Sequence, residues 1–209
     1  MFELYEQLLP IRLYTIHKTR VSDSSDSACR LCGIAQEGMA HISSACPALA
    51  QTKYLARRDA VLKVLFFKII CDLGLIDTVP PWYSPIEPQS VYETTEVQAY
   101  WDVPVYGGCR ELRANRVDPR IVNNREKQVV ALEMSCPWVS NRNKRTSEKT
   151  MKYAPLRWEL KQRYQGYEIN QCNIILDLLG GWSKDLNVTL QKLVGSKAKG
   201  VCRHVSQEH

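Results

Sequence analysis

The sequence lacks any long apolar segment. Its most apolar window, VLKVLFFKIICDLGLI, is interrupted by Lys63, Lys68 and Asp72, whereas a membrane-spanning helix needs about 20 consecutive apolar residues. The first residues, MFELYEQLLPIRLYTIHKTR, lack the apolar stretch of a signal peptide, and no internal repeat is present. These absences argue against a membrane protein, so we expect a soluble intracellular protein with no membrane partner.

The cysteines lack the spacing of a disulfide framework. Three cysteines and one histidine, which are side chains that can bind metal, follow the pattern Cys-x2-Cys-x8-His-x4-Cys. They are Cys29, Cys32, His41 and Cys46. This pattern has the form of a compact tetrahedral zinc site, with Gly33 closing the turn after the first pair. The alternative is a chance cluster in a reduced protein. The other cysteines are single and are expected to be reduced thiols: Cys71, Cys109, Cys136, Cys172 and Cys202.

Acidic residues are fewer than basic ones, 22 against 28, which gives a formal net charge of +6 and a pI near 8.9. This surplus is compatible with a nucleic-acid partner but does not establish one. Periodic apolar residues over 48–73 predict a long amphipathic helix. Arg57 and Arg58 lie on this helix, where they either contact phosphate or belong to a solvated face.

The chain divides at two polar or proline-rich stretches. These are the linker VSDSSDSA and a loop over 78–89 that contains four prolines. The 209 residues suffice for one sizeable core and a small module. We predict a helical segment and linker over 1–27, a zinc knuckle over 28–47, a connecting helix over 48–78, a larger domain over 90–195, and a basic disordered tail over 196–209.

The larger domain is predicted to open with a short helix around Thr94 and a strand in AYWDVPVY. Asp102 is either a further acidic contributor to a site or, as we favour, a turn or strand-end residue. Pro155 is expected to kink or restart the long helical segment that follows the central strands. A strand over 168–179 and a closing helix over 182–194 complete the domain.

Two carboxylates, Asp118 and Glu133, lie on extended segments joined by a polar turn. The continuous apolar run 129–132 is typical of a strand buried on both faces. If residues 124–127 make the turn, antiparallel pairing places Asp118 directly opposite Glu133, with Cβ atoms about 5 Å apart. Two acids at that distance repel each other unless a proton or a cation lies between them. The natural occupant is a divalent ion that prefers oxygen, such as Mg²⁺ or Mn²⁺; the alternative is a core glutamate paired with a nearby Arg or Lys.

Two lysines follow the acids in the sequence. Lys149 and Lys152 are three residues apart, on one face of a predicted helix. A cation near a metal-bound phosphate can orient the attacking water or stabilise developing charge. Lysines on a helix are more often only solvated.

The segment 115–152 resembles the restriction-enzyme-like endonuclease of site-specific non-LTR retrotransposons, which insert by target-primed reverse transcription. That family carries Arg-Pro-Asp, an acid a dozen or so residues later, and catalytic lysines on the following helix. Here Arg116-Val117-Asp118 is followed by 14 residues and Glu133, and the segments ALEMSCPW, NR and KYAPLRWEL are also similar. Val117 stands where proline is usual, and proline follows the aspartate as Pro119.

The resemblance covers roughly 28–193, because a similar zinc knuckle precedes the endonuclease in that family. It implies a mixed α/β fold, with the αβββαβ core of restriction-like nucleases after the CCHC knuckle and a long helix. It also implies a nuclear location and a metal-dependent endonuclease that nicks double-stranded DNA. Asp118 and Glu133 would ligate Mg²⁺ or Mn²⁺, Lys149 or secondly Lys152 would steady the attacking water, and Zn²⁺ would be structural. The residues expected to contact nucleic acid are Arg57, Arg58, Arg116, Arg142, Lys144 and Arg145.

The sequence leaves other functions open. No Tyr-x-Asp-Asp polymerase motif is present, so this chain alone is not expected to copy RNA. A catalytically degenerate nucleic-acid-binding module is the first alternative, because the displaced proline could have removed the cleavage site. DNA is the expected partner, with RNA as the alternative. A zinc-stabilised scaffold with no nucleic-acid role is the third hypothesis.

Overall fold

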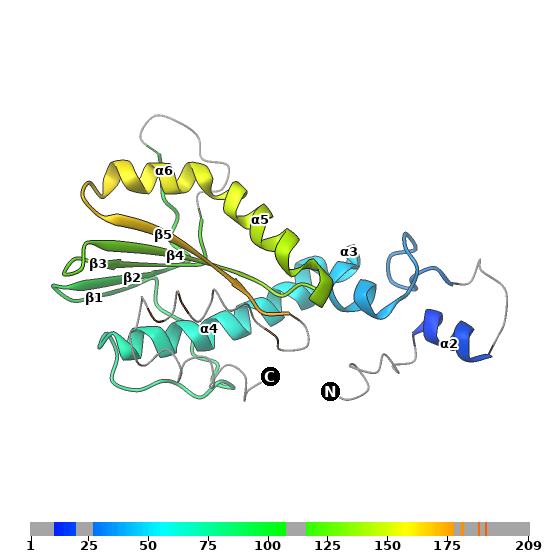
Figure 1. Cartoon of the computed structure of the whole chain (residues 1–209). Helices are drawn as coiled ribbons and strands as arrows, with labels where there is room; N and C mark the ends of the chain where they lie inside the picture. The colour runs from blue at the N-terminus through cyan, green and yellow to red at the C-terminus, as the bar shows by residue number, and fades with distance from the viewer. Residues whose placement is uncertain are drawn as a thin grey trace.

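The protein is a mixed α and β structure in which helices cover both faces of one sheet (Figure 1). It is seen here in a computed structural model, which describes residues 11–19, 27–107 and 116–177 together with residues 181, 188 and 191. The helices are α2 (Arg12–Thr19), α3 (Pro47–Leu49), α4 (Leu55–Asp72), α5 (Arg142–Lys152) and α6 (Ala154–Arg163). Shorter turns are π-helical over His41–Ala45 and Ala50–Tyr54 and 3₁₀-helical over Val139–Asn141.

The sheet has five strands in the order β1-β2-β3-β4-β5. They are β1 (Val91–Glu93), β2 (Val97–Trp101), β3 (Pro119–Asn123), β4 (Gln128–Ser135) and β5 (Glu168–Ile175). The first four are joined in antiparallel pairs, whereas β5 runs parallel to β4. A parallel neighbour needs a long crossover, and α5 and α6 supply it on the upper face in Figure 1.

Two apolar clusters hold the layers together. On the lower face in Figure 1, α4 buries Leu62, Phe66 and Ile69 against side chains of the sheet that include Leu132 and Ile174. On the other face, the cluster is smaller and consists of Val105, Val117, Val122, Val129, Ala131, Tyr153, Leu156 and Leu160. The run 129–132 thus contributes alternately to both faces, which confirms the prediction of a doubly buried strand.

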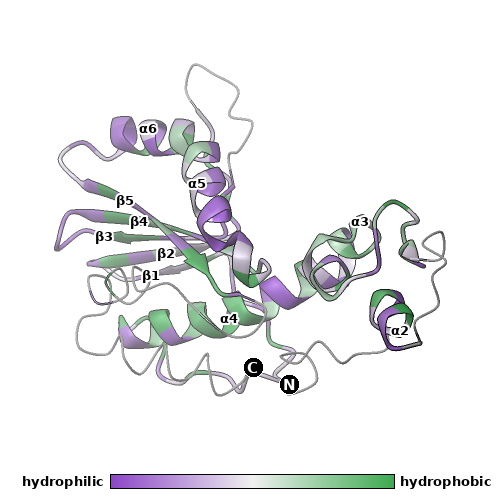
Figure 2. Ribbon diagram, turned by 45° about the vertical axis from the view of Figure 1, so that its right-hand side comes forward, coloured by the Kyte–Doolittle hydropathy of each residue, from purple (hydrophilic) through white to green (hydrophobic). Residues whose placement is uncertain are grey.

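The predicted long helix is present but is not uniform. A continuous helical path runs from Pro47 to Asp72, but its first part consists of α3 and the π-helical turn Ala50–Tyr54. Figure 2 shows the apolar side of α4 turned toward the sheet. The predicted stripe lies there, with Leu65 and Ile69 buried and Val61 and Leu73 packed at its margin. Tyr54, expected in the same stripe, instead lies at the zinc knuckle, where its hydroxyl is 3.0 Å from the Cys46 amide nitrogen.

The prediction of a short helix around Thr94 was wrong. Val91–Glu93 forms strand β1, which pairs with β2, and Thr94 lies in the tight connection between them. The Thr94 hydroxyl accepts a hydrogen bond from the Val97 amide at 3.1 Å. A threonine that bonds to a nearby amide favours a turn, and β-branched and aromatic neighbours favour strands. This local chemistry overrides the helix expectation.

Other boundaries follow the predictions more closely. The strand in AYWDVPVY ends at Trp101, because Asp102 has a φ of 50°. α5 ends at Lys152 and α6 begins at Ala154, so the chain restarts its helix at Pro155 as expected. The predicted closing helix over 182–194 lies outside the described residues apart from Val188 and Gln191, as does the tail. Within the described ranges, no helix combines the length and apolarity that a membrane crossing requires.

Candidate functional site

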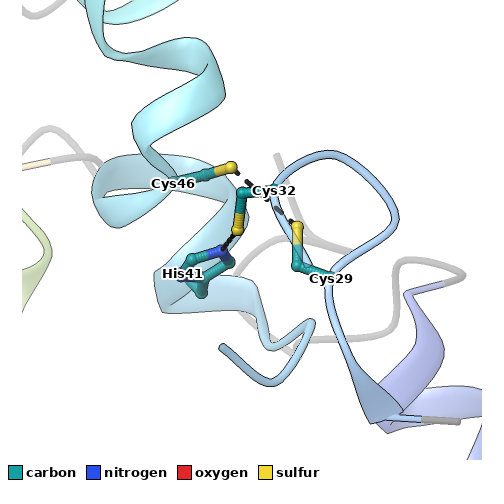
Figure 3. Close-up of side chains that lie close together, drawn as sticks. All are labelled: Cys29, Cys32, His41 and Cys46. Atoms are coloured by element: carbon teal, nitrogen blue, oxygen red, sulfur yellow. Dashed lines mark hydrogen bonds between the residues drawn. The ribbon is translucent and has the colours of Figure 1, made fainter. Parts of the chain in front are cut away.

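The four predicted zinc ligands converge on one point (Figure 3). The ligand atoms of Cys29, Cys32, His41 and Cys46 all lie within 4.8 Å of one another. The Cys29 and Cys46 sulfurs are 3.9 Å apart, and the Cys32 sulfur is 3.3 Å from His41 Nε2. Sulfurs on a tetrahedral zinc with Zn–S bonds of about 2.3 Å are separated by about 3.8 Å. The cluster therefore has the composition and the spacing to hold a zinc ion.

The local backbone explains how the ligands meet. Residues Ala28 and Gln36 pair as a short antiparallel bridge, and the Gly33 amide donates to the Cys29 carbonyl at 2.8 Å. Gly33 has a φ of 67°, a conformation that glycine adopts without steric cost. The turn therefore brings the first two cysteines together. His41 opens a π-helical turn that ends just before the fully buried Cys46.

Tyr54 fixes the second half of the knuckle. Its hydroxyl accepts the Cys46 amide at 3.0 Å and donates toward the Ile42 carbonyl, which lies 2.7 Å away. The first residues of the long helical path thus hold the backbone that carries His41 and Cys46. Groups that orient the ligands of a metal contribute to its affinity.

Glu37 connects the knuckle to the N-terminal helix. Its buried carboxylate accepts the backbone amides of Arg12 at 3.0 Å and Arg30 at 2.8 Å, and it pairs with the Arg30 guanidinium. Hydrogen bonds from Arg30, in opposition to burial, lower the pKa of Glu37 to about 2. Because Arg12 opens α2, this single carboxylate anchors α2 to the metal-binding turn.

We expect purified protein to carry one zinc ion per chain, and Cys32→Ser to lower this content sharply, because a structural site needs all four ligands. Elemental analysis of dialysed protein measures the ratio directly. Cys71→Ser is the matched control, because Cys71 lies on α4, outside the cluster. Zinc content below about a tenth of the protein concentration, or unaffected by Cys32→Ser, would contradict this assignment.

The two predicted acids face each other across β3 and β4. The register pairs Arg120 with Ala131 and Asn123 with Gln128, so continuing it by two residues sets Asp118 opposite Glu133. Residues 124–127 form the turn, as predicted. Asp118 also accepts the Met134 amide at 2.9 Å on Oδ2. The structure therefore brings the two predicted acids close together, and their joint role in binding a divalent ion stays a prediction.

Glu133 lies in the interior, with its residue 1% exposed. Oε1 forms an ion pair with Lys149 Nζ. Oε2 is buried and receives no hydrogen bond of ordinary geometry from the described residues. A buried carboxylate oxygen without a donor is costly, and a cation supplied by a ligand would satisfy it.

Asp118 is more accessible and only loosely paired. Arg58 Nη2 lies 3.7 Å from Asp118 Oδ1, and the Asp118 side chain is 15% exposed. Burial and then repulsion by Glu133 raise the pKa of Asp118 to about 6, although Arg58, the Met134 amide and Lys149 oppose the shift. The two acids are therefore close enough to repel each other, as carboxylates that share a cation site do.

Lys149 of α5 faces this site, whereas Lys152 is exposed at the end of the same helix. Lys149 reaches Glu133 directly, and Lys152 Nζ lies 3.1 Å from the Tyr153 hydroxyl. Burial and the charge of Glu133 raise the pKa of Tyr153, so its phenol lies close to the same carboxylate and stays protonated. The two lysines that the sequence singled out are thus brought together, one by contact and one through Tyr153.

Polar side chains of β5 hold α5 in place. Gln171 Nε2 donates to the Lys149 carbonyl at 3.1 Å. Asn173, which pairs with Glu133 across the parallel strands, donates to Thr150 Oγ1 at 2.7 Å and to the Thr146 carbonyl at 3.3 Å. These contacts fix the helix that carries Lys149.

A pocket opens beside Asp118, with a volume of about 190 Å³. Its lining includes the aromatic and apolar side chains of Trp101 and Leu62. The polar residues of the lining are Arg58, Asp59, Glu87, Asp102 and Asp118. Solvent and small groups can therefore approach Asp118 from the α4 side.

The arginines and lysine predicted to contact nucleic acid are scattered. Arg57 is turned inward: its Nη2 donates to the carbonyls of Ser43 at 3.0 Å and Cys136 at 3.4 Å. It thus links the knuckle to the segment that follows β4.

The exposed Arg116 pairs with Asp102 at 3.3 Å, which supports our strand-end assignment for that aspartate. Arg142, Lys144 and Arg145 lie together at the start of α5.

Sequence reasoning missed three residues of the site: Asp59, Tyr153 and Asn173. Asp59 holds Arg58 beside Asp118 from a helix far earlier in the chain, and no local pattern reports such a contact. The signal for Asn173 was available, because Gln171 and Asn173 alternate with buried Cys172 and Ile174 in β5. Polar residues at that spacing predict a strand face that contacts something polar.

Asp118→Asn is expected to stabilise the protein near neutral pH when no divalent ion except zinc is present. The folded pKa of Asp118 lies above its unfolded value, so its charged form weakens the fold, and stability falls as pH rises from about 4 through about 6. Asparagine mimics the protonated form and should add on the order of 2 kcal/mol above that range. Thermal unfolding at about pH 7.5 and about pH 5 should show a gain that shrinks at the lower pH. A variant less stable than the parent at the higher pH would contradict this.

No protein-family model matches this chain, and no curated protein is similar enough in sequence to count as a match. The likeness of the segment 115–152 to retrotransposon endonucleases is therefore an interpretation of a short motif. The geometry of the zinc knuckle and of the acid pair is the stronger guide to function.

Proposed function

We propose that this chain is a metal-dependent DNA endonuclease domain derived from a non-LTR retrotransposon, which nicks target DNA for target-primed reverse transcription. The observation that carries the proposal is the pairing of Asp118 with buried Glu133, with Lys149 of the next helix on the same carboxylate. After α4, the order of four strands (β1–β4), a helical crossover and β5 supports a restriction-like αβββαβ core to which one further strand is added.

The donor atoms of the acid pair suit a hard divalent cation. Glu133 Oε2 receives no hydrogen bond of ordinary geometry from the described residues, although the Tyr153 phenol lies close to this carboxylate. Asp118 Oδ1 is paired among these residues only with the distant Arg58 guanidinium. Magnesium is commonly bound by one or two carboxylates and completes its shell with water and substrate oxygens. Asp118 and Glu133 would hold Mg²⁺ or Mn²⁺, whereas the sulfur-rich knuckle suits Zn²⁺.

Phosphodiester hydrolysis needs a nucleophilic water and stabilisation of charge on phosphate. A bound Mg²⁺ supplies Lewis acidity and lowers the pKa of water. Lys149 Nζ, which pairs with Glu133, would orient the attacking water or stabilise the phosphate charge. Water oxygen bonds to phosphorus and gives up a proton to solvent, while the bond from phosphorus to the sugar O3′ breaks. The leaving O3′ oxygen takes up a proton, and the 3′-hydroxyl that results is the end that a primed synthesis requires.

The start of α5 offers the surface for the DNA backbone. This helix carries five basic residues and one acidic residue, and Figure 2 shows it as strongly hydrophilic. Lys144 and Arg145 are exposed on it, about one turn before Lys149. A phosphate backbone lying along α5 would therefore be directed toward the acid pair.

The test is a supercoiled-plasmid nicking assay with Mg²⁺ or Mn²⁺, run beside DNA binding at several salt concentrations. We expect conversion to the open circular form that depends on the divalent ion and persists through successive purification steps. Activity equal in the presence and absence of added divalent ion would overturn the proposal, as would the absence of both nicking and binding.

Lys144→Ala with Arg145→Ala is expected to weaken DNA binding equally for unrelated sequences. Removing two phosphate contacts should reduce the slope of log affinity against log salt by roughly two. Nicking at saturating DNA should persist, because neither side chain lies at the acid pair. Fluorescence anisotropy over a salt series measures the slope, and an unchanged slope would show that α5 does not contact phosphate.

A nucleic-acid-binding module without catalysis is the second candidate. It is favoured by one observation: Glu133 is already paired with Lys149 and Asp118 with Arg58, so the acids are partly neutralised without a divalent ion. The displaced proline is weaker evidence for a loss of catalysis. Pro119 opens β3 opposite Trp101, and the first residue of a strand tolerates proline. Salt-sensitive binding without nicking would favour this second function.

A further inference from the structure

Arg58 approaches the acid pair from the opposite layer of the molecule. It lies on α4, whereas Lys149 lies on α5 across the sheet. Its Nη2 atom is 2.6 Å from Asp59 Oδ1 and 3.7 Å from Asp118 Oδ1, and its Nε is 2.8 Å from the same Asp59 oxygen. The guanidinium is therefore held firmly by Asp59 and only loosely by Asp118.

The two cations differ in their surroundings. Lys149 pairs with a carboxylate that is 1% exposed on its side chain, so its role is tied to Glu133. The Arg58 side chain is 27% exposed and lines the 190 Å³ pocket beside Asp118. Among the residues that the structure describes, Arg58 is the one basic side chain in this lining, which also holds the carboxylates of Asp59, Glu87, Asp102 and Asp118. A phosphate group that entered together with a divalent ion, which offsets part of this negative charge, would meet the guanidinium next to the acid pair.

We propose that Arg58 is a further catalytic residue of the proposed nuclease, which binds a non-bridging oxygen of the scissile phosphate. This inference rests on the proposed function and deepens it. With a divalent ion on Asp118, Asp59 would keep the guanidinium at the pocket, and the N–H groups that Asp59 does not hold would bind the substrate. Arginine donors of this kind form paired hydrogen bonds with phosphate oxygens and stabilise the charge that develops there. Asp59 is the positioning residue.

The same placement has a second consequence. Without substrate, the positive charge of Arg58 lies beside a ligand of the divalent ion and opposes its binding. Removing Arg58 should therefore tighten the binding of the ion while slowing the reaction. A residue that only supports the fold would weaken both properties.

The experiment compares Arg58→Ala, Arg58→Lys and Arg125→Ala in the zinc-loaded full chain. Single-turnover nicking is measured at saturating DNA and Mn²⁺, and Mn²⁺ affinity is measured without DNA by electron paramagnetic resonance. Arg58→Ala should nick about 10²–10³-fold more slowly and bind Mn²⁺ several-fold more tightly. Arg58→Lys should recover part of the rate, since it keeps the charge but lacks the paired donors. Arg125→Ala is the control, because this arginine is exposed in the β3–β4 turn, away from the acids, and should change neither value.

The outcomes distinguish a failure of the role proposed for Arg58 from a failure of the proposed nuclease function. An Arg58→Ala protein that nicks at the parent rate, while Glu133→Gln is inactive, would overturn the role of Arg58 and leave the nuclease assignment intact. An Arg58→Ala protein that loses both Mn²⁺ binding and nicking would also overturn the catalytic role of Arg58, because the loss of both properties indicates a structural role. Parent-like nicking by Glu133→Gln would instead remove the proposed function itself.

Discussion

Glu133→Gln is expected to abolish metal-dependent nicking, by at least about 10³-fold, because it removes the buried charge that would hold the divalent ion together with Asp118. Glutamine keeps the shape and the hydrogen-bonding capacity of the side chain. DNA affinity should be unchanged or slightly higher, since one negative charge near the phosphate is gone. Single-turnover nicking and anisotropy titration measure the two properties separately.

This prediction depends on the separation between the acids and the basic surface. Glu133 is buried within β4, whereas Lys144 and Arg145 are exposed at the start of α5. Substitution of Glu133 should affect the rate of nicking, and substitution of Lys144 or Arg145 should affect DNA binding. Independently purified Asp118→Asn must also be inactive, which excludes a contaminating nuclease. Nicking by Glu133→Gln at the parent rate would show that Glu133 is a structural acid of the core.

The acid pair could be predicted because its geometry is local. The apolar run of β4, the polar turn and the two-residue period of strands fix which side chains oppose each other. The four residues between β3 and β4 set the register, and Asp118 falls opposite Glu133 as a consequence. The zinc knuckle is predictable for a related reason, since its four ligands lie within 18 residues of one another.

Contacts between distant segments were not predictable in this way. Arg58 reaches Asp118 because α4 packs under the sheet at one particular offset, and that offset depends on the whole apolar cluster around Phe66. The anchoring of α2 by Glu37 is likewise a contact between segments that are far apart in the sequence. Strand β1 was missed because three residues give too little pattern to outweigh a helix expectation, and its pairing with β2 decides its structure.

The ion pair between buried Glu133 and Lys149 also contributes to stability. Proteins keep buried charges only when these are paired, and losing one partner costs far more than losing both. In this protein, α5 and β4 are joined by one such pair, Lys149 with Glu133. Its removal therefore tests the site without any measurement of catalysis.

Lys149→Met is expected to destabilise the protein by about 3–5 kcal/mol, because it keeps the apolar stem of the side chain but leaves the Glu133 charge buried without its partner. Lys149→Met combined with Glu133→Gln should recover most of this loss, since no unpaired charge remains. Urea denaturation of zinc-loaded protein without other divalent ions measures both values. Lys144→Met is the matched control, because that lysine is exposed on the same helix and should shift stability by less than about 0.5 kcal/mol.

Added Mn²⁺ extends this prediction to the metal site. An ion that binds only the folded state stabilises it in proportion to the logarithm of its concentration. Lys149→Met should therefore regain stability as Mn²⁺ is added, because the ion replaces the lost cation beside Glu133. The double variant should gain much less, since its glutamine offers no charge to the ion. Equal gains in the two proteins would mean that Mn²⁺ binds elsewhere, and a Lys149→Met protein as stable as its parent would mean that the ion pair with Glu133 does not support the fold.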